Sequence, residues 1–174
     1  NINDIKSLFQ EDYTSLLKFY LEELNNGFIL KAKKLNLKNF RTHIKIRELI
    51  LLRLNLYQKE KKIIQKTYFS LLLPKHFNIS SYALYKTVNE IWFLAGDNST
   101  YFNFYSKRAI LSTIYSSVIF HWINNDDINL TKLFLDKQLL RVSKIPIVKS
   151  KIKNFSSQLP NGLKIYRRFF SAMQ

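Results

Sequence analysis

The sequence contains no cysteine, and only three glycines and three prolines among its 174 residues. Without cysteine the chain can form no disulfide, catalytic thiol or thiolate zinc site. β-Sandwiches and barrels need turn residues at short, regular intervals, which so few glycines and prolines do not supply. A composition of 47% hydrophobic and 15% aromatic residues is still enough to bury a core. We therefore predict an all-α fold built from long helices.

Long uncharged runs are also lacking. The longest runs from Ala109 to Asn125 and carries serines, a threonine, a histidine and two asparagines. It is too short and too polar to span a bilayer comfortably, so a buried helix is the preferred reading.

Apolar residues recur at helical spacing in six segments. These segments cover approximately residues 8–26, 39–56, 60–73, 80–95, 100–122 and 129–142. Gly27, Pro74 and Gly96 are the expected stops of the first, third and fourth, and Ser80 or Ser81 the expected cap of the fourth. The fifth helix is predicted to carry Ala109, Ile110, Thr113, Ile114, Val118 and His121 on one side. The sixth is predicted to turn Leu130, Leu133, Phe134 and Leu140 inward.

The composition changes after Pro146. The segment beyond it is basic, and its helical pattern is interrupted again at Pro160. We therefore predict two parts, a helical domain at 1–145 and a basic amphipathic tail or helix at 146–174.

Motifs of catalytic sites are missing. The chain has no phosphate-binding glycine loop, no paired histidines at metal-binding spacing and no G-x-S-x-G elbow. Its adjacent carboxylate pairs would diverge by about 100° on a helix instead of converging on a substrate. We predict a protein that is not an enzyme and has no metal or cofactor of its own.

Positive charge dominates, with a formal net charge of +16. From Arg141 onward there are eight basic residues and no carboxylate, since Asp136 is the last acidic residue. Such a balance favours an anionic partner, which could be nucleic acid, a phospholipid surface or an acidic protein. A biased genomic composition that makes every surface basic is the alternative explanation.

Residues 89–108 read NEIWFLAGDNSTYFNFYSKR and combine several features that packing alone does not require. Gly96 permits a tight helix end, Asp97 and Ser99 can cap the following helix, and that helix can begin at Ser99 or Thr100. Phe104, Tyr105 and Arg108 share one helical face.

This segment resembles the signature of the ubiquinone (coenzyme Q) biosynthesis accessory family that includes coenzyme Q biosynthesis protein nine, approximately D-x-x-W-x-x-A-G-D-x-S-T-D-x-N-W-Y-T-K-R. The resemblance continues through Pro74–Asn78, Thr131–Asp136 and the ending at Leu159–Phe170. Asn89 and Tyr101 replace family aspartates, and Phe104 replaces a tryptophan.

The resemblance implies a TetR-regulator-like helical fold whose N-terminal helix-turn-helix portion is largely missing. It implies an accessory protein that binds a polyprenylated quinone intermediate, or another isoprenoid lipid, as its ligand. The protein would present this ligand to the di-iron demethoxyubiquinone hydroxylase at an anionic membrane, and a homodimer is possible. The expected location is the cytoplasmic face of the bacterial inner membrane, or the matrix side of the inner membrane in a eukaryote.

Three sets of site residues follow. The resemblance assigns the partner surface to Ile91, Phe104, Tyr105 and Arg108. The apolar stripes suggest Leu84, Val88, Trp92, Ile110, Ile114 and Val118 as the lipid-binding set, although periodicity cannot tell a cavity from a filled core. The membrane-binding set is Lys164, Tyr166, Arg167, Arg168, Phe169 and Phe170.

The alternative function is a TetR-like nucleic-acid-binding regulator. Phosphate neutralisation by the basic surplus would support it. The position of that surplus disfavours it, because a recognition helix should precede the ligand-binding helices, whereas the basic segment lies at the other end of the chain.

Overall fold

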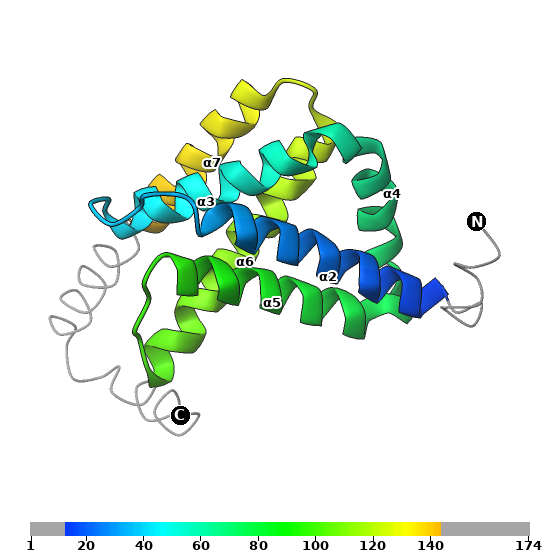
Figure 1. The fold of residues 1–174 in the computed structure, drawn as a ribbon, viewed down its shortest axis with the longest axis horizontal. Coiled ribbons are helices and arrows are strands. Elements are labelled where there is room, and N and C mark those ends of the chain that lie inside the picture. The colour runs from blue at the N-terminus through cyan, green and yellow to red at the C-terminus, as the bar shows by residue number, and fades with distance from the viewer. Residues whose placement is uncertain (1–12, 144–174) are drawn as a thin grey trace, which may run out of the picture. The chain divides into compact units, whose positions relative to one another are not determined.

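A computed structural model describes residues 13–143, apart from the side chains of Phe102 and Ser143 (Figure 1). Its elements are α2 (Tyr13–Ala32), α3 (Thr42–Tyr57), the 3₁₀ turn η1 (Gln58–Glu60), α4 (Lys61–Leu71), the 3₁₀ turn η2 (Pro74–His76), α5 (Phe77–Leu94), α6 (Tyr101–Asn124) and α7 (Ile128–Ser143). The described residues contain helices and no strand, which confirms the all-α prediction. The TetR-like arrangement and the boundary after residue 145 stay predictions.

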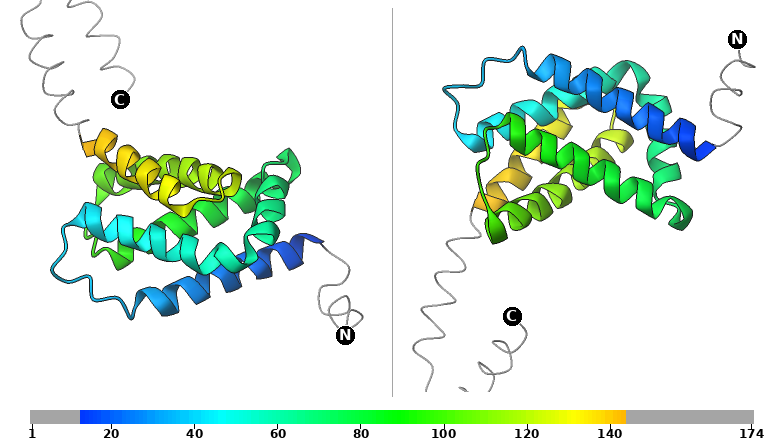
Figure 2. Two further views of the ribbon diagram at one scale, coloured as in Figure 1. Left: turned by 90° about the horizontal axis from the view of Figure 1, so that it is seen from above. Right: turned by 60° about the horizontal axis from the view of Figure 1, so that its bottom comes forward.

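The helices pack in a layered arrangement with α2 and α5 side by side (Figures 1 and 2). α6 makes its main contact with α5, and α3 contacts α2, α5 and α6. α4 runs across the end where α2 and α5 begin (Figure 1). Arg47 of α3 links to Asp136 of α7 through two hydrogen bonds, from Nε at 2.5 Å and from Nη2 at 3.1 Å. Within residues 13–143 no helix is both long and apolar enough to cross a membrane.

α2 continues past Gly27, so the prediction that this glycine ends the first helix is wrong. The apolar stripe does not stop there, because Phe28 and Ala32 are buried one and two turns beyond Leu24. Their burial favours continued helix over a cap, and an added Cβ at Gly27 would meet open space.

α5 begins at Phe77, three residues before the predicted cap. The hydroxyls of Ser80 and Ser81 donate to the carbonyls of Phe77 and Asn78, so they lie inside the first turns instead of capping them. Pro74 does end the preceding helix, as predicted, since α4 stops at Leu71 and a 3₁₀ turn starts at the proline.

The predicted inward faces of the last two helices are partly wrong. On α6, Ala109 and Thr113 are exposed. The buried α6 side chains are Arg108, Leu111, Ile114, Tyr115, Val118, Ile119, Trp122 and Ile123. On α7, Leu130, Leu133 and Leu140 are exposed, whereas Thr131 and Leu135 are fully buried. Apolar residues surround both helices, so their spacing alone does not identify the buried side.

Candidate functional site

The turn after α5 positions Asp97, the first residue of the site. Gly96 has φ +83°, a backbone conformation that residues with a Cβ rarely adopt. The N–H of Gly96 donates to the carbonyl of Phe93, and the N–H of Asp97 to that of Trp92, each at 3.0 Å. These two bonds form a Schellman cap, as the glycine predicted. The cap directs the chain so that Asp97 faces the start of α6.

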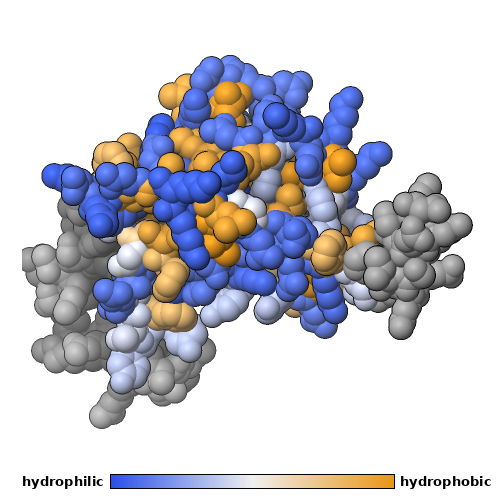
Figure 3. All heavy atoms as spheres, viewed as in Figure 1, coloured by the Kyte–Doolittle hydropathy of each residue, from blue (hydrophilic) through white to orange (hydrophobic). Residues whose placement is uncertain are grey.

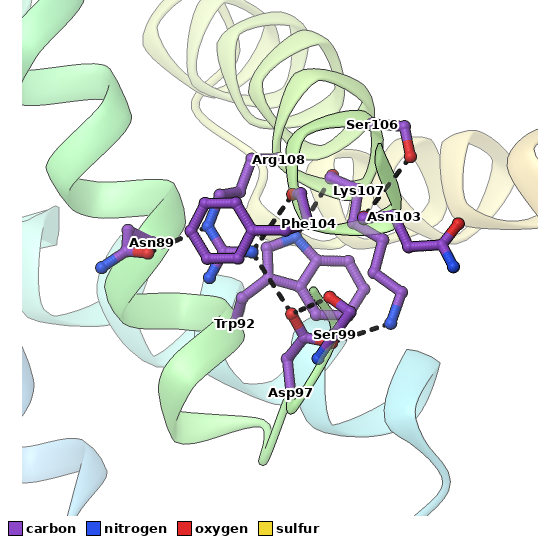
Figure 4. Close-up of polar contacts among 9 residues, drawn as sticks. All are labelled: Asn89, Trp92, Asp97, Ser99, Asn103, Phe104, Ser106, Lys107 and Arg108. Atoms are coloured by element: carbon purple, nitrogen blue, oxygen red, sulfur yellow. Dashed lines mark hydrogen bonds and ion pairs between the residues drawn. The ribbon is translucent and has the colours of Figure 1, made fainter. Parts of the chain in front are cut away.

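Asp97 is the negative centre of this site, with a side chain only 2% exposed (Figure 4). Its carboxylate accepts hydrogen bonds from Lys107 Nζ at 2.7 Å, Ser99 Oγ at 2.7 Å and Arg108 Nη1 at 3.3 Å. The prediction that Asp97 or Ser99 caps α6 is wrong, because the N-cap residue is Thr100 and it makes no side-chain cap bond. Burial alone would raise the pKa of Asp97, but these three hydrogen bonds outweigh it and lower the pKa to about 2.

Arg108 joins α6 to α5. Its Nε donates to Asn89 Oδ1 at 2.9 Å and its Nη1 to the carbonyl of Phe104 at 3.2 Å. The guanidinium carbon lies 3.3 Å from the centre of the Phe104 ring, in a cation–π stack (Figure 4). We call Asn89, Asp97, Lys107 and Arg108 the polar cluster.

The indole of Trp92 lies under this cluster. Its Nε1 donates to the carbonyl of Lys107 at 3.2 Å, and Lys107 Nζ lies 5.2 Å from the ring centre. Phe104 packs edge-on against Tyr105, with ring centres 5.2 Å apart. The cluster therefore supports an aromatic pair on the outside of α6.

The four residues predicted to bind a partner have different placements. Tyr105 is 70% exposed and Phe104 is half-buried. Arg108 is buried beneath Phe104, and Ile91 is fully buried in the core. Ile91 is therefore corrected to a core residue, because its side chain is fully buried and offers no surface to a partner. Partner binding at Phe104 and Tyr105 stays a prediction.

Asn89 offers a direct test of the polar cluster's charge balance. Lys107 and Arg108 carry two positive charges against the single carboxylate of Asp97, and the resemblance places an aspartate at position 89. We expect Asn89→Asp to raise the unfolding free energy by about 1 kcal/mol, because an anionic carboxylate replaces the neutral amide oxygen that accepts the bond from Arg108. Thermal denaturation should show a rise of roughly 2–4 °C. Asn55→Asp, on an exposed position of α3, controls for lower net charge and should give no such rise. A fall in stability with Asn89→Asp would contradict the charge argument.

An apolar cavity of about 310 Å³ lies among α2, α3, α4, α5 and α6. Its apolar lining includes Leu24, Ile64, Leu71, Leu84 and Ile119. Leu72 and Phe77 line it and are also exposed, so it opens to the surface between the end of α4 and the start of α5. A second cavity of about 390 Å³ between α2 and α5 shares Leu21 and Ala83 with the first.

Of the predicted lipid-binding residues, Leu84 lines the first cavity. Val88, Trp92, Ile110, Ile114 and Val118 line neither of these two cavities. Most of these five are buried where α5 packs against α6, so their stripe forms filled core. The cavity lies instead on the side of α5 that faces α2 and α4.

Sequence reasoning missed the polar residues of this cavity. Arg53, Thr87 and Tyr115 line it, and all three are buried. A signal was present, because Arg53 interrupts the otherwise apolar run Leu49–Leu54 of α3. An arginine inside such an apolar run is rarely buried unless its charge is paired.

Other predicted features lie outside the reach of the structure. The six residues of the predicted membrane-binding set belong to the segment beyond residue 143, which is not described. Among residues 13–143 no group of three or more histidines, aspartates or glutamates could hold a metal ion.

Comparison with known proteins agrees with the sequence resemblance. Residues 77–146 match the profile of the COQ9 family. The mitochondrial ubiquinone biosynthesis protein COQ9 of Rattus norvegicus is 32% identical over 95 residues, which cover 53% of this chain and 30% of the relative. The Homo sapiens protein is 30% identical over the same shares. The match thus spans about a third of the length of these relatives. Residues 77–146, which contain the polar cluster and one wall of the cavity, are therefore similar to a segment of COQ9-family proteins.

Proposed function

We propose that this protein is a non-catalytic accessory protein of ubiquinone biosynthesis that binds a polyprenylated quinone intermediate and presents it to the di-iron demethoxyubiquinone hydroxylase. The observation that carries the proposal is the apolar cavity that opens between α4 and α5. Its volume of about 310 Å³ falls in the range of ligand pockets, and its lining is mainly apolar.

A carrier is needed because a polyprenyl chain is costly to expose to water. Each CH₂ group removed from water contributes about 0.8 kcal/mol, so such a lipid does not cross solvent unaided. The exposed Leu72 and Phe77 at the opening provide an apolar contact for the incoming chain. On the face drawn in Figure 3, apolar side chains form separate patches among hydrophilic ones, which suits loading at a membrane surface.

The partner surface in this proposal is the aromatic pair Phe104 and Tyr105. Exposed tyrosines backed by a rigid support are frequent interaction hot spots, and Arg108 supplies the support here. The relatives named above are mitochondrial proteins of ubiquinone biosynthesis. By analogy we place this protein peripherally at a membrane where the quinone is made, the matrix side of the inner membrane in a eukaryote.

The proposal is tested by filling the cavity. Leu84→Trp introduces a bulky ring at the cavity wall, so we expect at least a tenfold loss of isoprenoid lipid that co-purifies with the protein. Mass spectrometry of extracted lipid, normalised to protein, measures the loss.

Leu30→Trp is the matched control, because Leu30 is 65% exposed on α2 and lines neither described cavity. Its lipid content should equal that of the wild type. Absence of isoprenoid lipid from the wild-type protein, or equal content in Leu84→Trp, would refute the cavity as the lipid site.

A further inference from the structure

Arg53 lies in the middle of α3 and is only 5% exposed. Its guanidinium donates to three acceptors: Tyr115 Oη at 2.9 Å, Asn25 Oδ1 at 2.9 Å and Thr87 Oγ1 at 3.1 Å. All three acceptors are neutral. A guanidinium carries five N–H donors, so two of them are left over by these bonds.

The charge of Arg53 has no anionic partner among residues 13–143. The rings of Phe28, Tyr57 and Tyr115 surround it, with centroid distances of 4.9, 5.2 and 5.9 Å. Burial raises the pKa of the Tyr57 phenol far above its usual value, so that phenol stays protonated and supplies no negative charge. Burying an ion costs free energy unless a counter-charge accompanies it. The aromatic rings offset only part of that cost.

Arg53 places this uncompensated positive charge at the wall of the cavity. Arg53, Thr87 and Tyr115 are polar lining residues of a predominantly apolar pocket. Because both hydroxyls accept a hydrogen bond from Arg53, each can turn its own hydrogen toward a ligand.

The side-chain amide nitrogen of Asn25 is another donor without an acceptor, next to the guanidinium. Asn25 is 3% exposed, and its Nδ2 is the one buried side-chain polar atom of the described residues that has no hydrogen-bond partner. Its Oδ1 is already committed to Arg53. Buried donors of this kind are rare in folded proteins and call for an acceptor.

We propose that Arg53, with Thr87 and Tyr115, binds an anionic oxygen of the ligand's head group while the hydrocarbon chain occupies the apolar part of the cavity. The ligand class is thus an amphiphile with an ionised acidic head. This inference rests on the proposed lipid-binding function and adds acidic lipids to its ligands, because a quinone ring itself carries no ionised acidic group. A prenylated ring acid and an aliphatic fatty acid share the required oxygen, so the experiment includes both.

The test compares acids with their esters on the delipidated full chain at neutral pH. The probes are hexadecanoic acid, a prenylated benzoic acid and the methyl ester of each, with Kd measured by displacement of a fluorescent lipid probe. We expect each acid to bind at least tenfold tighter than its ester, because only the acid supplies the counter-charge. The acid with the lower Kd shows whether the site prefers a prenylated ring acid or an aliphatic fatty acid.

Two variants test whether Arg53 and Thr87 cause the preference for acid over ester. Arg53→Met keeps the length and apolar contacts of the side chain, and we expect it to weaken acid binding at least tenfold while the ester changes less than threefold. Thr87→Val removes one hydroxyl at constant volume, and we expect a weaker loss of acid preference. If Arg53→Met does not fold, the wild-type acid-to-ester ratio and Thr87→Val still decide the question.

The outcomes separate the two proposals. Equal binding of acid and ester to the wild type overturns the head-group inference and leaves lipid binding intact. Binding of neither kind of probe overturns both. A wild-type preference that persists in Arg53→Met overturns the assignment to Arg53.

Discussion

Asp97→Asn is expected to lower the unfolding free energy by about 3 kcal/mol, because it leaves the buried Arg108 without its anionic partner. Lys107 loses the same carboxylate, at 2.7 Å. An asparagine oxygen can still accept one hydrogen bond, so the change isolates the charge from the shape. Thermal denaturation followed by circular dichroism should show a decrease in Tm of roughly 6–12 °C.

Glu22→Gln is the matched control for Asp97→Asn. Glu22 pairs with Lys86 at 3.3 Å on the surface, where its side chain is 54% exposed. Exposed ion pairs contribute between zero and about 1 kcal/mol, so the control should change Tm by only a few degrees. Equal decreases in Tm for the two variants would show that Asp97 contributes no more to stability than an exposed ion pair does.

The same carboxylate predicts a pH dependence. Its pKa is about 2 in the folded protein and 3.8 in the reference state, so the folded state favours the ionised form. This stabilisation is fully present above the reference value and is lost as the pH falls from about 4 to 2. The shift corresponds to about 2 kcal/mol. Denaturation of the wild type and Asp97→Asn across this pH range should show their difference in stability shrinking toward low pH.

Under the proposed function, Tyr105→Lys is expected to weaken binding to the di-iron hydroxylase at least tenfold while leaving the fold intact. Tyr105 is 70% exposed, so its replacement removes little buried area. A lysine deletes the aromatic contact and adds another positive charge near Lys107 and Arg108. Truncating a hot-spot tyrosine costs about 2 kcal/mol or more at an interface. Biolayer interferometry with the purified hydroxylase measures the Kd, and thermal denaturation measures the fold.

Tyr82→Lys is the control for Tyr105→Lys. Tyr82 is also exposed, and it precedes Trp92 on α5 by ten residues, or about 15 Å along the helix axis. It should leave hydroxylase binding unchanged. If Tyr105→Lys instead collapses the thermal transition, Tyr105 is a structural residue. If it leaves both fold and Kd unchanged, the partner surface lies elsewhere.

The motif of residues 89–108 could be interpreted from sequence because most of its contacts are local. The cap at Gly96 forms within five residues, and Asp97 reaches Lys107 and Arg108 only ten and eleven positions away. A glycine after an apolar stripe fixes a turn of known geometry, and helical spacing fixes which neighbours share a face. The sequence did not show that Asp97 binds the second turn of α6 instead of capping its first.

Sequence patterns alone were enough to predict that residues 13–143 are mainly helical, approximately where α4 and α5 end, and that residues 89–108 form one motif. Tertiary structure decided that Ile91 is core, that α7 buries Thr131 and Leu135 instead of Leu130 and Leu133, and that Arg53 lies beside a cavity. The physical reason is that periodicity describes one helix at a time. When apolar residues surround a helix, its buried side and the space left between side chains depend on neighbours distant in the sequence, as Asn25, Arg53 and Thr87 show.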